Sequence, residues 1–140
     1  MITKDSETAD DIAVPAHVPS DLPGVVCGYH LAVLKPRTRR AEGGYLYWAL
    51  RSQLVRQQCT VAATGVTRFG LRTDAIGGVR VPLPSIKIQT EIADRLDQAQ
   101  ARVDQLTKAL DRQVNLLQEH RQALITAAVT GQLDVAKAVA

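Results

Sequence analysis

Apolar positions in the last third of the chain follow a heptad repeat. Between Ile88 and Ala128 the sequence contains neither glycine nor proline. The apolar residues are separated by alternating steps of four and three residues and then by steps of seven: Ile92, Leu96, Ala99, Val103, Leu106, Leu110, Leu117 and Leu124. This spacing places one apolar stripe along a helix, and it predicts a long helix over residues 85–131 that forms a coiled coil with another helix.

The residue types at both ends of this stretch are typical of helix boundaries. Pro82 and Pro84 would end a preceding strand, and Ser85 can cap the first helical turn. Gly131 can supply the left-handed residue that ends the helix. A helix of about 45 residues would be roughly 65 Å long. Its apolar stripe needs a second helix, from a partner or from another copy of the chain.

Two polar residues, Gln113 and His120, fall on the continued heptad positions. Polar residues in a coiled-coil seam lower its stability and fix the register or orientation of the pairing. Alternatively, Val114 and Leu116 take over as the apolar stripe drifts around the helix. The sequence leaves both interpretations open.

The first 84 residues alternate short apolar runs with turn signals, which predicts a small α+β domain. The helical pattern runs from Tyr45 to about Gln58, with Leu46, Leu50 and Leu54 on a face that would pack on a sheet. Residues 60–63 read as a strand or as the end of this helix. The expected strands are the end of one at residues 1–2, a short one at 12–15, one or two with a kink at Gly28 within 25–34, and a last one at 79–83.

Basic charge is concentrated ahead of the long helix. Residues 35–80 contain nine basic and two acidic side chains, a net charge of +7 in a chain whose total is +3. All but one of these basic residues are arginine, the side chain best suited to bidentate contacts with phosphate and guanine. This composition favours a nucleic-acid partner, and a solvated basic face is the alternative.

The sequence indicates no enzyme active site, metal site or cofactor. Cys27 and Cys59 fit no metal or redox spacing and are expected to be buried thiols. The three histidines have no ligand residue at metal spacing. No apolar run approaches the ~18 residues of a membrane span, and a cytoplasmic location is expected. The best candidate for nucleic-acid contact is the loop over residues 64–70, where Thr67 and Arg68 stand between two glycines.

The ends of the long helix carry a family resemblance. VPLPSIKIQTEIADRLD at its start and LLQEHRQALITAAVTGQLDV at its end closely resemble helix boundaries in the specificity subunit of type I restriction-modification enzymes. The preceding GYLYWALRSQ and the G-x-T-R loop resemble the end of a target recognition domain. The resemblance implies that a complete subunit carries two such domains, each reading half of a bipartite DNA sequence, and two long antiparallel helices between them. It also implies that separate modification and restriction subunits perform methylation and cleavage.

On this resemblance the chain is expected to be the C-terminal part of a specificity subunit. The expected organisation is a target recognition domain at residues 1–84, incomplete at its amino-terminal side, a spacer helix at 85–131 and a tail at 132–140. Residues expected near double-stranded DNA are Thr67, Arg68, Arg72, Arg37, Arg39, Arg40 and Lys4. Residues expected in a helix–helix interface, in a homodimer or with another specificity-subunit helix, are Ile92, Leu96, Val103, Leu106, Leu110, Leu117 and Leu124. The alternative is a truncated module that associates through its helix without reading DNA.

Overall fold

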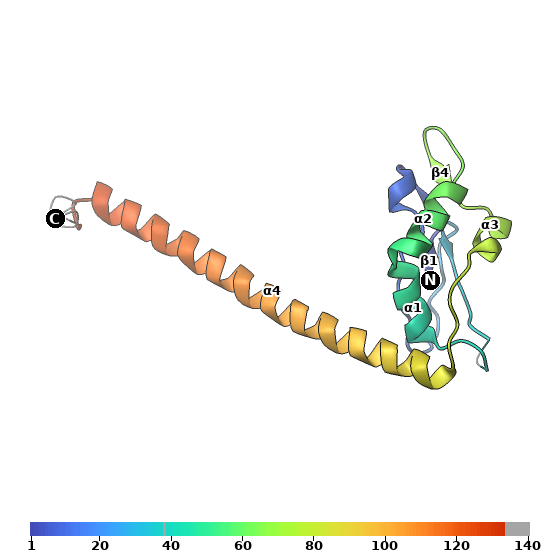
Figure 1. Ribbon diagram of the computed structural model, residues 1–140. Coiled ribbons are helices and arrows are strands. Elements are labelled where there is room, and N and C mark those ends of the chain that lie inside the picture. Colours follow the sequence, from blue (N-terminus) through green and yellow to red (C-terminus); the bar gives the residue numbers. More distant parts are fainter. Residues whose placement is uncertain (38, 134–140) are drawn as a thin grey trace. The chain divides into compact units, whose positions relative to one another are not determined.

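The computed structural model describes residues 1–37 and 39–133 and divides them into two units (Figure 1). Unit 1 spans Met1–Leu96 and unit 2 begins at Asp97. The elements are β1 (Ile2–Thr3), β2 (Asp5–Ser6), the 3-10 helix η1 (Ala9–Asp11), β3 (Leu31–Ala32), α1 (Gly43–Arg51), α2 (Gln53–Ala62), β4 (Phe69–Gly70), α3 (Thr73–Gly78) and α4 (Ile86–Val129). Helices and short strand pairs occur together, so the predicted α+β class is confirmed.

The strands of unit 1 form two small antiparallel pairs. In β1 and β3, Ile2 lies opposite Ala32; in β2 and β4, Asp5 lies opposite Gly70. The buried apolar residues that hold these pairs against α2 come from segments far apart in sequence: Ile2, Ile12, Ala13, Val55, Cys59 and Leu71. The core of unit 1 is therefore small and contains few large side chains.

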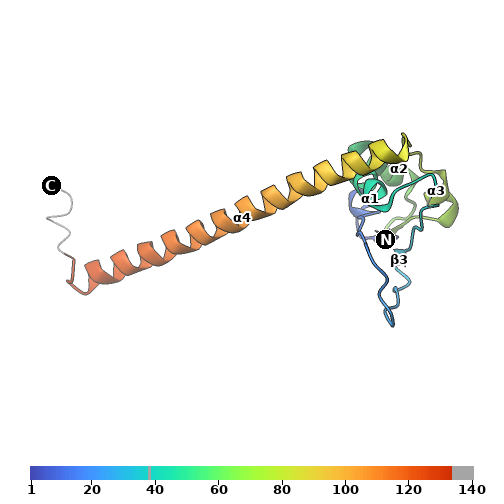
Figure 2. The same ribbon diagram turned by 90° about the horizontal axis from the view of Figure 1, so that it is seen from below.

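The two cysteines differ in exposure. Cys59 is buried as predicted, and desolvation raises the pKa of its thiol. Cys27 is exposed, so the prediction of two buried thiols is wrong for this residue. Cys27 lies in the long irregular segment between η1 and β3, and this segment extends away from the helices and strands of unit 1 (Figure 2).

The single helix predicted from Tyr45 to about Gln58 is two helices with a break at Ser52. The backbone of Ser52 is extended (φ −65°, ψ 146°), and its hydroxyl accepts a hydrogen bond from the Val55 N–H. Ser52 thus caps α2, as serine does at helix starts. The break changes which face is buried: Val55 and Cys59 point into the core, whereas Leu54 is 58% exposed and does not pack on the sheet as predicted. Residues 60–62 continue α2, so they are the end of a helix.

The last predicted strand, residues 79–83, is an extended segment without a strand partner among the described residues. Its backbone is paired with side chains instead. Gln58 accepts a hydrogen bond from the Arg80 N–H and donates one to the Arg80 carbonyl, and the Tyr45 hydroxyl donates to the Pro82 carbonyl. Proline also has no N–H to offer a neighbouring strand, so Pro82 and Pro84 weaken any pairing of this segment.

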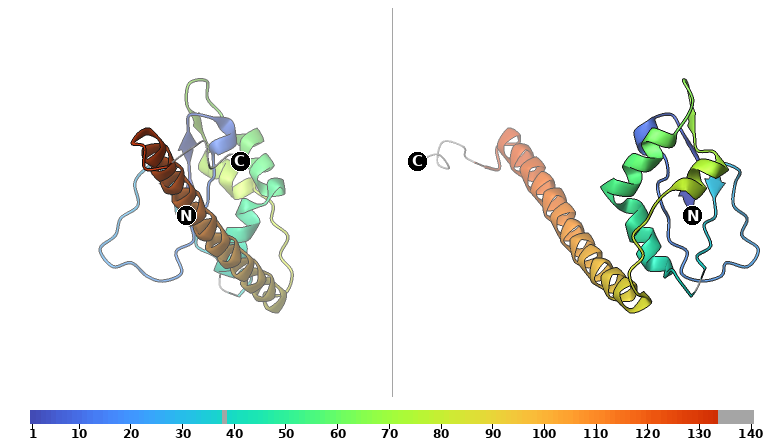
Figure 3. Two further views of the ribbon diagram at one scale, coloured as in Figure 1. Left: turned by 90° about the vertical axis from the view of Figure 1, so that its left-hand side faces the viewer. Right: turned by 45° about the vertical axis from the view of Figure 1, so that its right-hand side comes forward.

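Two further strand predictions are only partly correct. Within residues 25–34 only Leu31–Ala32 form a strand, and the preceding residues belong to a long loop in which Val26 is 91% exposed (Figures 2 and 3). Residues 12–15 bend at Ala13, which is in the left-handed region at φ 60°. The segment still pairs with β1, because the Ala13 N–H donates to the Thr3 carbonyl, the Thr3 N–H donates to the Val14 carbonyl, and Pro15 forms an isolated antiparallel bridge with Ile2.

The long helix agrees closely with its prediction, because α4 spans the 44 residues Ile86–Val129. Gly131 has φ 75° and follows the helix end, where the Gln132 N–H bonds back to the Ala127 carbonyl. Of the predicted tail, residues 134–140 lie outside the described part of the chain. None of the described helices is both long and apolar enough to cross a membrane.

The apolar heptad residues of α4 are exposed on the single chain. Those in unit 2 are 54% (Val103), 65% (Leu106), 60% (Leu110), 68% (Leu117) and 44% (Leu124) exposed. In unit 1, Leu96 is 38% exposed and Ile92 is partly buried. Pairing of this helix with another helix remains a prediction.

Candidate nucleic-acid interface

The loop between α2 and β4 is closed by backbone hydrogen bonds. Thr64 and Gly70 exchange both bonds, with N···O distances of 3.1 and 2.8 Å. Gly65 has φ +140°, and a Cβ atom there would lie 2.0 Å from the Arg68 carbonyl oxygen. Only glycine allows this approach. The result is a tight loop that holds Thr67 and Arg68 in exposed positions.

The variant Gly65→Ala tests whether this loop depends on glycine. We expect it to destabilise the chain by about 1–3 kcal/mol, because the added methyl group overlaps the Arg68 carbonyl and the backbone must leave its present conformation. Thermal unfolding and amide hydrogen exchange at Thr64 and Gly70 measure the effect. The matched control is Gly77→Ala in α3, where nothing lies within 4 Å of the new Cβ. Equal shifts in both variants would contradict the steric argument.

Arg68 lies beside a histidine–aspartate pair. His30 Nδ1 is 2.5 Å from an Asp5 carboxylate oxygen, and Arg68 Nη2 is 3.4 Å from the same nitrogen. The short distance to the carboxylate requires a proton on Nδ1, so this nitrogen donates to Asp5 and cannot accept from Arg68. The guanidinium therefore keeps its N–H groups for another acceptor. The hydrogen bond from His30 lowers the pKa of the Asp5 carboxyl, and the charges of Lys4 and Arg68 lower it further.

Lys4 and Arg72 lie next to the same loop. The Lys4 carbonyl accepts from the Leu71 N–H, and Lys4 and Arg72 both line a pocket of about 650 Å³ whose wall includes Thr64 and Gly70. Arg72 Nε donates to an Asp74 carboxylate oxygen at 3.2 Å and lowers the pKa of Asp74. Both side chains are more than two-thirds exposed, so this ion pair is weak and can yield to a phosphate.

The other three predicted DNA-binding residues are elsewhere in unit 1. Arg37, Arg39 and Arg40 are exposed and precede α1, at the end of the unit opposite the loop that contains Thr67 and Arg68 (Figure 1). The structure thus brings together Lys4, the loop and Arg72, and leaves the arginines before α1 as a separate basic segment.

Sequence reasoning assigned no role to Gln89, which connects the start of α4 to the start of α1. Its side chain is fully buried. It accepts a hydrogen bond from the Glu42 N–H at 2.9 Å and donates to the Arg40 and Pro84 carbonyls at 3.1 and 2.7 Å. The Glu42 carboxylate in turn caps α1 by accepting from the N–H groups of Gly44 and Tyr45. The only sequence signal was the position of Gln89 within the family-like helix start.

The sequence also did not predict that His30, Asp5 and Arg68 lie together. His30 is 25 residues from Asp5 and 38 residues from Arg68 in the chain. In the described part of the chain, no group of three or more His, Cys, Asp or Glu side chains is placed to hold a metal ion.

Comparisons with known proteins agree on one family. Residues 16–116 match the family model described as type I restriction modification DNA specificity domain. The chain is 34% identical to the type I restriction enzyme EcoDI specificity subunit of Escherichia coli, over 72% of this chain and 22% of that protein. It is 27% identical to the StySPI specificity subunit of Salmonella potsdam, over 81% of this chain and 23% of that protein. The matches thus span less than a quarter of these relatives. A search of solved structures found no significant match.

Proposed function

Because the chain belongs to the family of type I restriction-modification DNA specificity domains, we propose that it supplies one DNA-contacting surface and one spacer helix to such a system. The observation that supports this proposal most directly is the grouping of Lys4, Arg68 and Arg72 around a loop that Gly65 holds in place. A preformed loop with exposed cations loses little conformational entropy when it meets a charged ligand.

In this proposal Arg68 reaches a phosphate or a guanine edge, and the Thr67 hydroxyl bonds to a neighbouring phosphate. The free guanidinium N–H groups suit the two acceptors of guanine or a pair of phosphate oxygens. Lys4 and Arg72 add phosphate contacts next to the Arg68 contact, and the negative charge of the nearby Asp5 carboxylate attracts the Arg68 guanidinium. Arg37, Arg39 and Arg40 provide a separate set of phosphate contacts at the other end of unit 1.

The proposed role of α4 is assembly. Its exposed apolar stripe would pair with the same helix of a second copy or with another specificity-subunit helix. The modification and restriction subunits of a type I system would be the protein partners in the cytoplasm. The chemistry of methylation and cleavage would belong to those subunits, so the chain itself would not be an enzyme.

The variant Arg68→Ala tests the DNA contact. We expect the chain, assembled with the modification subunit from the same genome, to bind duplexes of about 30 base pairs, with affinity that falls steeply between roughly 50 and 200 mM salt. Arg68→Ala should weaken this binding by about tenfold and reduce the salt slope by about one. Arg102→Ala, an exposed arginine of α4, is the control and should bind as the parent does. Identical binding by Arg68→Ala and the parent would refute the loop assignment.

A second function rests on the exposed stripe of α4 alone. In that case the chain would associate with another helix through α4, or bind the modification subunit, without contacting DNA. A stable assembly whose affinity for duplex DNA does not change with salt or with Arg68→Ala would favour this function over DNA recognition.

A further inference from the structure

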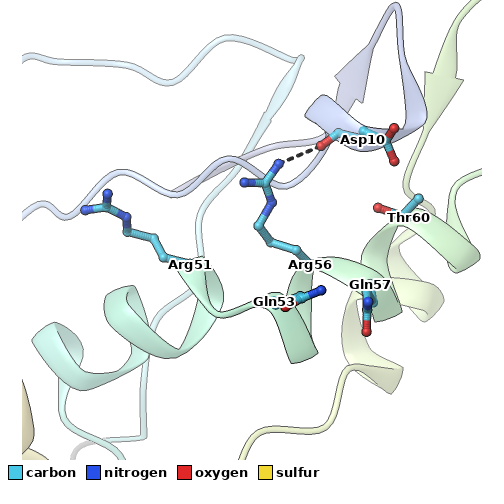
Figure 4. Close-up of a pocket in the computed structure, with 6 residues that line it drawn as sticks. All are labelled: Asp10, Arg51, Gln53, Arg56, Gln57 and Thr60. Atoms are coloured by element: carbon cyan, nitrogen blue, oxygen red, sulfur yellow. Dashed lines mark hydrogen bonds between the residues drawn. The ribbon is translucent and has the colours of Figure 1, made fainter.

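A second polar surface runs along α2. A pocket of about 300 Å³ is lined by Asp10, Arg51, Gln53, Arg56, Gln57 and Thr60 (Figure 4). We call these six residues the α2 face. Gln53, Arg56, Gln57 and Thr60 follow helical spacing of three, one and three residues, so they share one side of the helix. Every side chain that lines this pocket is polar or charged, although the opposite side of α2 packs into the core through Val55 and Cys59.

Contacts within unit 1 hold the two arginines of the α2 face. Arg56 Nη2 donates to the Asp10 carbonyl at 2.8 Å (Figure 4). Arg51 Nη1 donates to the Tyr47 hydroxyl at 2.9 Å, and its guanidinium carbon lies 4.7 Å from the centre of the Trp48 ring. Within residues 1–37 and 39–133, neither guanidinium is paired with a carboxylate. Both positive charges are thus oriented and still available to an anion.

The α2 face adjoins the loop already assigned to DNA. α2 ends at Ala62, and the loop begins two residues later at Thr64. Its ten residues give a length of about 15 Å. This length matches the rise of roughly four to five base pairs of duplex DNA. A duplex that contacts both the loop and the α2 face would cover at least this length.

We infer that the α2 face is a second DNA-contacting surface, in which Gln53 and Gln57 meet base edges while Arg51 and Arg56 meet phosphates. This inference rests on the proposed function and extends it to residues on a different element. Glutamine offers one donor and one acceptor in the arrangement that pairs with adenine in the major groove, and arginine binds phosphate bidentately.

The composition of the α2 face fits DNA better than a protein partner. The centre of a protein–protein interface is apolar and poor in charge, whereas this pocket has no apolar lining residue. The lining contains two guanidinium groups and one carboxylate, that of Asp10, so the surface favours a polyanion. Asp10 can also accept a hydrogen bond from a cytosine amino group.

The test uses the double variant Gln53→Ala/Gln57→Ala in the full chain, assembled with the modification subunit. The probe is a pool of duplexes of about 30 base pairs with random sequence, from which bound molecules are recovered and sequenced. The control is Gln98→Ala/Gln105→Ala, which removes two exposed glutamines from α4. We expect the α2 variant to bind the parent's selected sequence about tenfold or more weakly and to lose preference at one or more base pairs. The salt slope should stay unchanged, because no phosphate contact is removed.

The companion variant Arg51→Ala should instead lower the salt slope by about one without changing the selected sequence. Unchanged affinity and unchanged selection in the Gln53/Gln57 variant, together with weakened binding by Arg68→Ala, would overturn this inference alone. No binding of any duplex by the parent assembly would overturn both it and the proposed function. Loss of the modification subunit from the Gln53/Gln57 variant would identify the α2 face as a protein interface and also overturn the inference.

Discussion

Leu106→Glu is expected to abolish association through α4. Leu106 is a heptad residue near the middle of the helix, and its side chain is 65% exposed on the single chain. In a paired helix it would be buried against the partner, and a carboxylate at that position would lose its water without gaining a counter-charge. We expect the dissociation constant to rise by about a hundredfold or more, because buried unpaired charges at an interface centre cost several kcal/mol.

Sedimentation equilibrium over a range of chain concentrations measures this effect. The matched control is Gln105→Glu, which adds the same charge one residue earlier, outside the heptad positions. Circular dichroism would confirm that both variants remain helical. A parent chain that is monomeric and fully helical at micromolar concentration would contradict self-association, and a Leu106→Glu variant that associates as tightly as Gln105→Glu would contradict the assigned seam.

Gln89→Leu is expected to produce the largest loss of stability in unit 1. Leucine fills a similar volume but can make none of the three hydrogen bonds of Gln89. The Glu42 N–H and the carbonyls of Arg40 and Pro84 would lose this partner next to a fully buried side chain. Each unsatisfied buried group costs about 1–3 kcal/mol. We therefore expect a loss of at least about 3 kcal/mol, and a fall in Tm of roughly 10 °C or more.

The fluorescence of Trp48, the single tryptophan of the chain, reports the unfolding of unit 1 independently of the helical signal of α4. The matched control is Gln98→Leu, the same substitution at an exposed position of the same helix, which should leave the Trp48 transition within about 0.5 kcal/mol of the parent. Gln89→Glu separates the roles of the two side-chain atoms. It keeps an acceptor for the Glu42 N–H but removes the donor to Arg40 and Pro84, so it should also destabilise unit 1. Equal transitions for Gln89→Leu and Gln98→Leu would show that the hydrogen bonds of Gln89 contribute nothing measurable.

Local signals in the sequence were sufficient for α4 and for its C-terminal boundary. The heptad positions from Ile92 to Leu124 repeat over many turns without a glycine or proline. Helical hydrogen bonds join residues four apart, so such a segment needs no distant partner to define its secondary structure. The glycines also indicated the loop at Thr67 and Arg68. Of the two, Gly65 has a positive φ and a close backbone approach that only glycine allows, whereas Gly70 does not. The family resemblance, carried by the helix boundaries, is likewise confirmed.

The sequence alone was insufficient wherever distant segments compete for the same backbone or side-chain groups. The break at Ser52 changes which residues of α2 are buried. The regular spacing of the leucines around Ser52 did not predict this break. In the segment expected to form the last strand, the backbone N–H and carbonyl of Arg80 are hydrogen-bonded to the Gln58 side chain and not to another strand.

The sequence by itself therefore determined the long helix, its apolar stripe, the basic character of residues 35–80 and the family. Only the tertiary structure decided which of the basic residues lie close together. It placed Lys4, Arg68 and Arg72 beside one loop, separated Arg37, Arg39 and Arg40 from them, and exposed the α2 face as a further polar surface. The physical reason is that helix periodicity is a local property of the chain. Which charged side chains lie close to one another depends instead on strand pairing and core packing between residues that are far apart in sequence.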